Sequence, residues 1–183
     1  MYVVETIHDI ACYNYDHRGL TMSGTKDFTH IEGDKIKMVD IGAKADVIRI
    51  ARAQGTIRLT RGTMELIRSG SVKKGNVLAT ARVAAIQGVK RTWDMIPLCH
   101  QIPVTGIDVE FDVGEETITT TVEVKSLGKT GVEMEALCGV SLGLLTIWDM
   151  VKAVEKDETG NYPETRISDI KVTSKIKEAP GGT

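Results

Sequence analysis

One long apolar stretch, Leu137 to Val151, limits most strongly what this chain can fold into. Its aliphatic residues predict a core helix, which we place from about Val132 to Lys156. Asp149 and Lys152 lie three residues apart near the end of this helix, so they share one face. Such pairs are usually solvated salt bridges, and the spacing alone favours that interpretation. The alternative is proton chemistry, because a half-buried carboxylate beside an amine can exchange the roles of base and acid.

The composition argues against several classes of protein. The chain has 183 residues, enough for one domain with a sizeable core. A net charge of −2 and an aromatic content of 4% give no reason to expect a nucleic-acid partner. The apolar stretch is shorter than the ~20 residues of a membrane span, and the N-terminus lacks the pattern of a signal peptide. Three widely spaced cysteines predict neither disulfides nor a zinc ribbon, so we expect a soluble, cytoplasmic protein without membrane partners.

The rest of the chain alternates between predicted strands and helices. Asn76 is a favoured N-cap for a helix that Pro97 ends, and Gly114 lies in the tight connection of a β-hairpin. Thr130 and Glu133 match a capping box, which predicts where the long helix begins. The predicted elements are strand 56–60 after an extended segment, helix 63–69, helix 77–93, strands 104–113 and 117–127, helix 132–156 and strand 166–174. Their β-α-β-β-α-β order predicts an α+β ferredoxin-like sandwich, with helices on one face of an antiparallel sheet.

The sequence predicts three regions along the chain. Residues 1–37 mix Tyr, His, Gly and Thr without periodicity, so we expect a loosely structured arm. Residues 38–175 contain the periodic elements and form the predicted ferredoxin-like domain. Residues 176–183 are expected to form a disordered tail.

Residues other than Asp149 and Lys152 are weaker candidates when each is taken alone. Glu133 and Glu135 lie two residues apart and cannot share one helix face, and the capping box already employs Glu133. A lone histidine such as His100 is more often structural than catalytic, and Cys99 beside it is more often a small buried hydrophobe. The histidines show no metal-ligand spacing, so no metal site is expected. Lys74 precedes a predicted helix N-terminus, where an anion can bind.

Four motifs together resemble one known family. They are MVDIGAKA at 38–45, RTWDMIPLCHQIP at 91–103, GKTGVEMEAL at 128–137 and LTIWDMVKAVEKD at 145–157. In this order they resemble the molybdenum cofactor biosynthesis protein C family, and the similarity covers roughly Met38 to Ser174. The activity of that family is cyclic pyranopterin monophosphate synthase, a phosphorus–oxygen lyase.

The resemblance implies a reaction and an assembly. The reaction converts the cyclised GTP intermediate 3′,8-cyclo-7,8-dihydro-GTP into cyclic pyranopterin monophosphate, with release of pyrophosphate. The implied ferredoxin-like protomer forms dimers that assemble into a hexamer, with active sites at subunit interfaces. No cofactor is implied, and Mg²⁺ accompanying the triphosphate is left open. The rival interpretation is an oligomer of the same fold that binds nucleotides without turning them over.

The resemblance also implies roles for individual residues. Asp149 is implied to be catalytic, with Lys152 as its partner and Lys74 as a further catalytic position. The implied substrate-binding positions are Arg49, Leu98, Cys99, His100, Glu133, Met134 and Glu135. Family members commonly carry a C-terminal SGGKSG segment whose lysine contributes to the site, whereas this chain reads TSKIKEAPGGT. We expect either that Lys175 or Lys177 takes this role or that the role is lost.

The length of the core helix separates two groups of these residues. Glu133 and Glu135 lie at its start, and Asp149 lies about four to five turns later at ~3.6 residues per turn. A straight helix cannot bring both ends to one small substrate. We therefore expect the two ends to serve different sites across a subunit interface.

Overall fold

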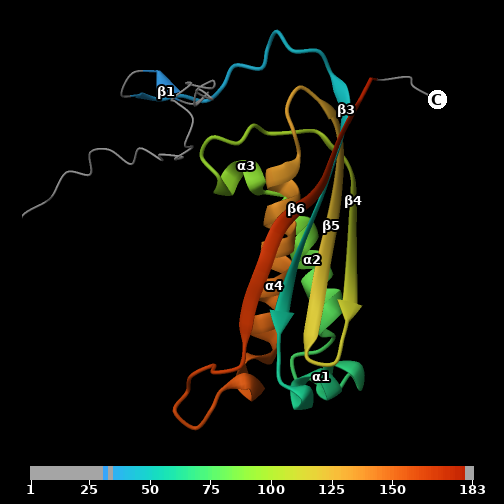
Figure 1. Cartoon of the computed structure of the whole chain (residues 1–183), viewed down its shortest axis with the longest axis vertical. Helices are drawn as coiled ribbons and strands as arrows, with labels where there is room; N and C mark the ends of the chain where they lie inside the picture. The colour runs from blue at the N-terminus through green and yellow to red at the C-terminus, as the bar shows by residue number, and fades with distance from the viewer. Residues whose placement is uncertain (1–30, 33–34, 180–183) are drawn as a thin grey trace, which may run out of the picture.

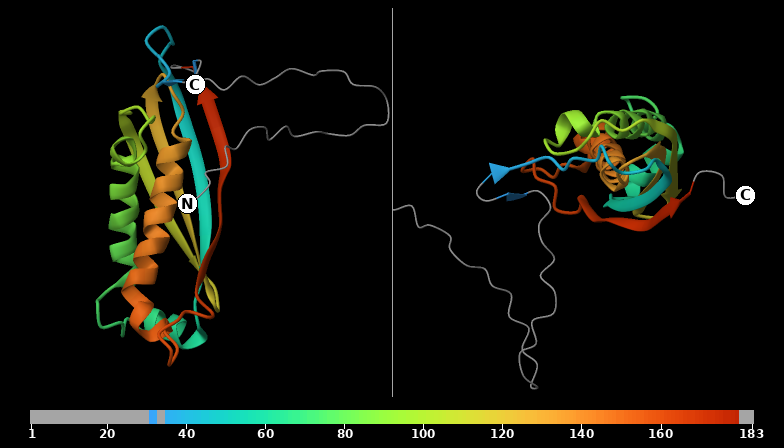
Figure 2. Two further views of the ribbon diagram at one scale, coloured as in Figure 1. Left: turned by 90° about the vertical axis from the view of Figure 1, so that its left-hand side faces the viewer. Right: turned by 90° about the horizontal axis from the view of Figure 1, so that it is seen from above.

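A four-stranded antiparallel sheet carries two long helices on one face. The computed structural model describes residues 31–32 and 35–179. Its sheet is ordered β4-β5-β3-β6, and the helices α2 and α4 lie side by side against it (Figure 1, Figure 2). The bounds are β3 (Val47–Arg58), α2 (Val77–Lys90), β4 (Val104–Val113), β5 (Thr117–Gly128), α4 (Glu133–Glu155) and β6 (Arg166–Glu178). The β-α-β-β-α-β order and the placement of the helices confirm the predicted ferredoxin-like sandwich.

Shorter elements complete the described chain. Two helices flank α2, namely α1 (Arg61–Arg68) before it and α3 (Thr92–Met95) after it. The short strands β1 (Ile31–Glu32) and β2 (Lys35–Ile36) pair with each other near the start of the described chain. The division into arm, domain and tail stays a prediction, and residues 1–30, 33–34 and 180–183 lie outside the described residues.

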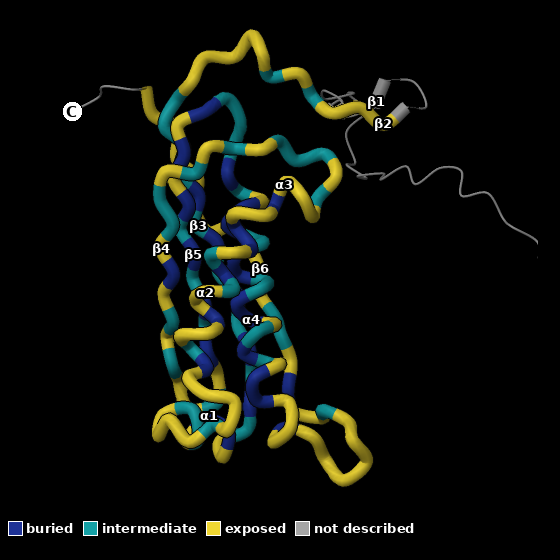
Figure 3. The backbone as a smooth tube through the Cα atoms, turned by 180° about the vertical axis from the view of Figure 1, so that it is seen from behind, coloured by how far each residue is buried: buried dark blue, intermediate teal, exposed yellow. Residues whose placement is uncertain are grey.

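The helix α4 forms the centre of the core. By length and composition alone it could cross a membrane. However, Ala136, Val140, Leu144 and Ile147 are fully buried, and α4 packs against α2 and the strands β3 and β5. Figure 3 shows the buried positions gathered where the helices meet the sheet. This burial explains why the predicted core helix is so apolar.

A buried carboxylate fixes the far end of α4. Glu155 is 5% exposed and accepts hydrogen bonds from the backbone N–H of Thr60 (3.1 Å) and from the Thr60 hydroxyl (2.7 Å). The Thr165 hydroxyl donates to the same carboxylate. Burial opposes ionisation of Glu155, but these donors outweigh it and lower the pKa of the carboxyl group. The network ties α4 to the segments that enter α1 and β6.

The strands are longer than the sequence predicted. The strand expected at 56–60 begins already at Val47, because the whole segment to Arg58 pairs with β5. The last strand continues past the expected end at Ser174 to Glu178, since its pairing with β3 runs on as far as Ile48. Charged residues within both strands concealed these extensions from pattern analysis.

Two predictions about helix ends were wrong, and one was right. The helix expected at 77–93 is interrupted at Arg91, which separates α2 from α3. The capping box is absent, because Val132 is the N-cap of α4 and no side chain caps this helix. Asn76 caps α2 as predicted, accepting a hydrogen bond from the backbone N–H of Ala79 (2.9 Å).

The contact between α2 and α4 depends on a glycine. A Cβ atom added at Gly88 would lie 2.9 Å from the Cys138 carbonyl oxygen and 3.0 Å from Leu142 Cδ1. We expect Gly88→Ala to lower the free energy of unfolding by about 1–3 kcal/mol, as overpacking usually does. The measurement is urea denaturation followed by circular dichroism.

The matched control is Gly62→Ala, at an exposed position of helix α1. A Cβ atom there meets nothing within 4 Å. Alanine should stabilise this helix by up to about 1 kcal/mol. Equal effects of the two substitutions would refute the close-packing argument.

Candidate active site

The predicted site residues fall mainly into two groups at opposite ends of α4. The first, which we call the lysine–aspartate cluster, consists of Lys74, Asp149 and Lys152. The second lines a cavity at the start of α4, which we call the front cavity; its predicted members are Leu98, Cys99, His100, Met134 and Glu135. The helix is continuous, so Glu135 and Asp149 lie about 21 Å apart along its axis at ~1.5 Å per residue.

The lysine–aspartate cluster joins two distant parts of the chain. Lys152 Nζ lies 2.7 Å from Asp149 Oδ1 on the same helix face. Lys74, in the turn before α2, donates to Asp149 Oδ2 (2.9 Å) and also to the Asp149 backbone carbonyl (2.6 Å). The aspartate is therefore held between two amines, only one of which was paired with it on sequence spacing.

The electrostatics of this cluster keep the aspartate ionised. The hydrogen bond from Lys152 and then that from Lys74 lower the pKa of Asp149 to about 2. The same ion pair raises the pKa of Lys152. Asp149 is a weak base in this state, but a phosphate group that drew either lysine away would raise its basicity. All three side chains are exposed, so the cluster is accessible to a ligand.

The front cavity has a volume of about 300 Å³ and is formed by three segments. Leu98, Cys99 and His100 come from the loop after α3, Met134 and Glu135 come from the first turn of α4, and residues 39–44 close the remaining side. His100 Nε2 lies 2.8 Å from the Val39 carbonyl oxygen, which fixes the imidazole ring. Two successive residues of α4, Met134 and Glu135, thus border one cavity.

Glu135 is the most perturbed group of the front cavity. Its residue is 3% exposed, and its Oε2 atom has no hydrogen-bond partner within the described part of the chain. Burial raises the pKa of Glu135 to about 7, and the charge of Glu133 adds to the increase. Burial likewise raises the pKa of the Cys99 thiol. Glu135 can therefore give or take a proton near neutral pH, whereas Cys99 stays a neutral thiol.

Two predicted substrate-binding residues lie outside the front cavity. Arg49 donates from Nε to the Gly128 carbonyl (2.9 Å) and from Nη2 to the Lys129 carbonyl (3.0 Å), so its guanidinium holds the end of β5. Glu133 forms an ion pair with Lys175 of β6. Of the two lysines proposed to replace the glycine-rich segment, Lys175 is thus the one in contact with a predicted site residue.

Sequence reasoning missed part of the cavity wall. Lys44 lines the front cavity. Its position in the sequence gave no reason to distinguish it from the other lysines and arginines expected at the surface. Lys129 Nζ donates to the Gly42 carbonyl (2.7 Å) and holds the same segment in place. The signal that could have found this wall is the MVDIGAKA motif, which contains both Gly42 and Lys44.

The described residues contain no group of three or more His, Cys, Asp or Glu side chains that could hold a metal ion. The expectation of no metal site stays a prediction, because His8, His17 and His30 lie outside the described residues.

The raised pKa of Glu135 makes stability depend on pH. The folded protein binds a proton at Glu135 more tightly than the unfolded chain does, so this residue costs stability as pH rises from about 4.5 through about 7. Replacing it with the neutral isostere, Glu135→Gln, should remove a cost of about 3 kcal/mol at pH 8 and change little at pH 4. Urea denaturation at both pH values measures this, and an equal effect at both would contradict it.

Comparison with known proteins agrees with the motifs. Residues 38–178 match the model of the MoaC family. A probable cyclic pyranopterin monophosphate synthase of Methanosarcina acetivorans is 61% identical over 152 residues, which cover 83% of this chain and 96% of the relative. Proteins of the same name from Methanosphaerula palustris and Pyrococcus furiosus are 63% and 59% identical, over 82% of this chain in each case and over 98% and 96% of the relatives. The chain therefore belongs to the MoaC family.

Proposed function

We propose that this protein is a cyclic pyranopterin monophosphate synthase of molybdenum cofactor biosynthesis. It converts 3′,8-cyclo-7,8-dihydro-GTP into cyclic pyranopterin monophosphate and releases pyrophosphate. The observation that carries the proposal is the 61% identity to a relative of that name over 96% of the relative's length. The two clusters supply the cations and the proton-transfer groups that such a reaction needs.

The lysine–aspartate cluster suits the triphosphate end of the substrate. Forming a cyclic phosphate requires a substrate hydroxyl to attack phosphorus while the bond to the leaving pyrophosphate breaks. The amines of Lys74 and Lys152 would neutralise the developing charge on the leaving group. Asp149, freed from these amines by the phosphates, would accept the hydroxyl proton. The scheme uses no cofactor.

The front cavity suits the ring system of the substrate. A guanine-derived ring carries N–H donors and carbonyl acceptors that match the free carboxyl oxygen of Glu135 and the imidazole of His100. Opening and reclosing rings requires protons to move near neutral pH, and Glu135 has the pKa for this task. Glu135 is therefore the acid–base group that we assign to the ring chemistry, and His100 is a substrate-binding residue beside it.

The separation of the two clusters supports an assembly in which protomers share active sites. One substrate can reach both only if the front cavity of one protomer faces the lysine–aspartate cluster of another. A two-fold dimer would create two such composite sites, because each protomer contributes one end of α4 to each. We propose such dimers, assembled in threes into a cytoplasmic hexamer.

The first test removes the charge of Asp149. We expect Asp149→Asn to fold and assemble but to lower kcat at least about 100-fold, as loss of a proton-transfer group usually does. Cyclic pyranopterin monophosphate is measured as fluorescent pterin after oxidation. The matched control is Asp108→Asn, an exposed aspartate of β4 that should keep wild-type turnover. A wild-type protein that binds the intermediate but yields no pterin would establish the rival, a nucleotide-binding oligomer.

The second test asks whether the sites are composite. Asp149→Asn and Glu135→Gln should each be inactive alone. When subunits of the two variants are mixed at random, about a quarter of the composite sites regain both wild-type groups, so activity should return to about a quarter of wild type. Size-exclusion chromatography with light scattering establishes exchange and oligomeric state. Exchange without regained activity would refute the composite site.

A further inference from the structure

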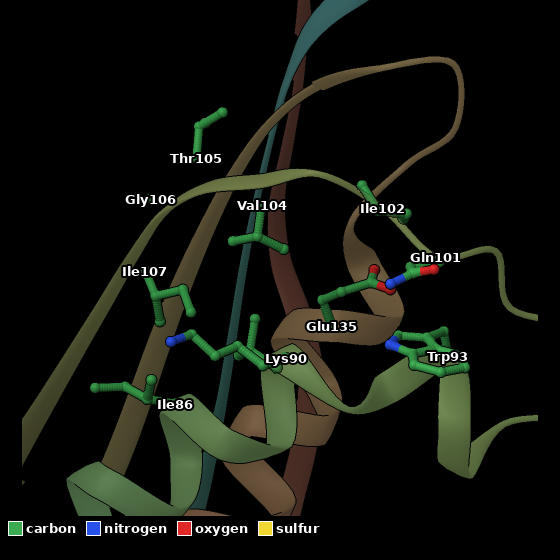
Figure 4. Close-up of a pocket in the computed structure, with 11 residues that line it drawn as sticks. Ile86, Lys90, Trp93, Gln101, Ile102, Val104, Thr105, Gly106, Ile107 and Glu135 are labelled. Atoms are coloured by element: carbon green, nitrogen blue, oxygen red, sulfur yellow. The ribbon is translucent and has the colours of Figure 1, made fainter.

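A second cavity lies behind the front cavity and is not used by the proposed mechanism. It has a volume of about 430 Å³, lies between the end of α2 and the start of β4, and we call it the back cavity. Ile86, Val104 and Ile107 supply its apolar lining, while Lys90 and Trp93 lie on its α2–α3 side (Figure 4). Its volume is ample for water, which occupies about 30 Å³ per molecule in the liquid.

Glu135 belongs to both cavities. It lines the front cavity together with His100 and the back cavity together with Lys90, and Ile102 is the other residue that the two linings share. The wall between the cavities therefore consists of one carboxyl group and one aliphatic side chain. Any polar group that reaches Glu135 from the back can act on it while substrate occupies the front.

Gln101 is the polar group placed to do this. Figure 4 shows its carboxamide directed at the Glu135 carboxyl group, whereas the Lys90 amine points along the cavity toward Ile107 and Thr105 points away. Gln101 is an exposed residue, whereas Glu135 is buried. It follows His100 directly in the chain, which couples its position to that of the imidazole in the front cavity.

We propose that Gln101 is a positioning residue for the Glu135 carboxyl group, toward which its carboxamide points from the back cavity (Figure 4) while Glu135 faces substrate in the front cavity. The role in catalysis rests on the proposed function, but the contact itself does not. An amide at this place donates to the ionised carboxyl and accepts from the protonated one, so it orients the group in both states. Gln101 itself remains neutral and does not touch the substrate.

Several charged or titratable groups line the two cavities together with Glu135 or influence its charge. Glu133 lies on the same helix, Lys90 lies on α2, Cys99 and His100 lie on the loop after α3, and Lys44 lies on the segment before β3. The residues of β4 that line the back cavity are Val104, Thr105, Gly106 and Ile107, which carry no charge. Substitutions at Gln101 introduce a charge beside Glu135 and leave all of these groups in place.

The test places opposite charges at Gln101. Gln101→Glu is isosteric and should raise the midpoint of Glu135 titration, whereas Gln101→Lys should lower it, each by about one pH unit. The titration is followed by carbon NMR of protein labelled at the glutamate carboxyl carbon, and the Glu135 signal is assigned as the one lost in Glu135→Gln. This measurement needs no substrate.

The matched controls are Gln87→Glu and Gln87→Lys. Gln87 is an exposed glutamine of α2 that lines neither the front nor the back cavity. Neither control should move the Glu135 midpoint. The proposal would be overturned if both Gln101 variants shifted the Glu135 midpoint identically or if neither shifted it. It would also be overturned if the Gln87 variants shifted the midpoint as much as the Gln101 variants do.

Turnover then separates the contact from its catalytic role. In an active synthase, the pH profile of kcat should shift to higher pH in Gln101→Glu and to lower pH in Gln101→Lys, while KM changes little. Opposite NMR shifts with an unmoved profile would overturn the role in catalysis. Opposite NMR shifts with no pterin from the wild type would refute the proposed function and leave the contact established.

Discussion

The burial of α4 against α2 and the sheet is the interaction on which the rest of the structure depends. Ala136, Val140 and Leu144 lie fully inside, and Gly88 lets the two helices approach closely. Because this helix is packed along its length, both of its ends are held in fixed positions relative to the sheet. The rigid core thus sets where the front cavity and the lysine–aspartate cluster lie, even though neither belongs to the core.

The two ends of α4 carry carboxyl groups in opposite environments. Asp149 is exposed and held by two amines, which lowers its pKa to about 2. Glu135 is buried with an unpaired oxygen, and its pKa is raised to about 7. When their environments move the pKa values of two carboxyl groups in opposite directions, one group can act as an acid while the other acts as a base. At neutral pH the first is always a carboxylate and the second exchanges a proton readily.

The sequence was most informative where local pattern determines structure. The alternation in 104–113 and 117–127 predicted the β-hairpin, and the apolar run around Leu144 predicted α4. It was misleading where tertiary contacts decide. The buried Thr92 hydroxyl donates to the Gly88 and Val89 carbonyls at the end of α2, next to the break at Arg91. Nothing in the spacing indicated that break.

Pattern analysis met the same limit in the candidate site. Asp149 and Lys152 could be paired by helical spacing, but Lys74 joins them from 75 residues away. Glu133 was assigned to a capping box, whereas its carboxylate pairs with Lys175 on β6. The contact of His100 with Val39 spans 61 residues. Motif resemblance found these residues, but only the fold shows which of them lie together.

The lysine–aspartate cluster has a consequence for which anions it can retain. Its two ammonium groups outnumber the carboxylate, yet each already has Asp149 as an internal counter-ion. A monovalent anion from solution must displace that carboxylate and gains little by doing so. A polyphosphate offers several negative oxygens at once and can satisfy both amines together. The internal counter-ion therefore favours polyanions over monovalent anions such as chloride at this cluster.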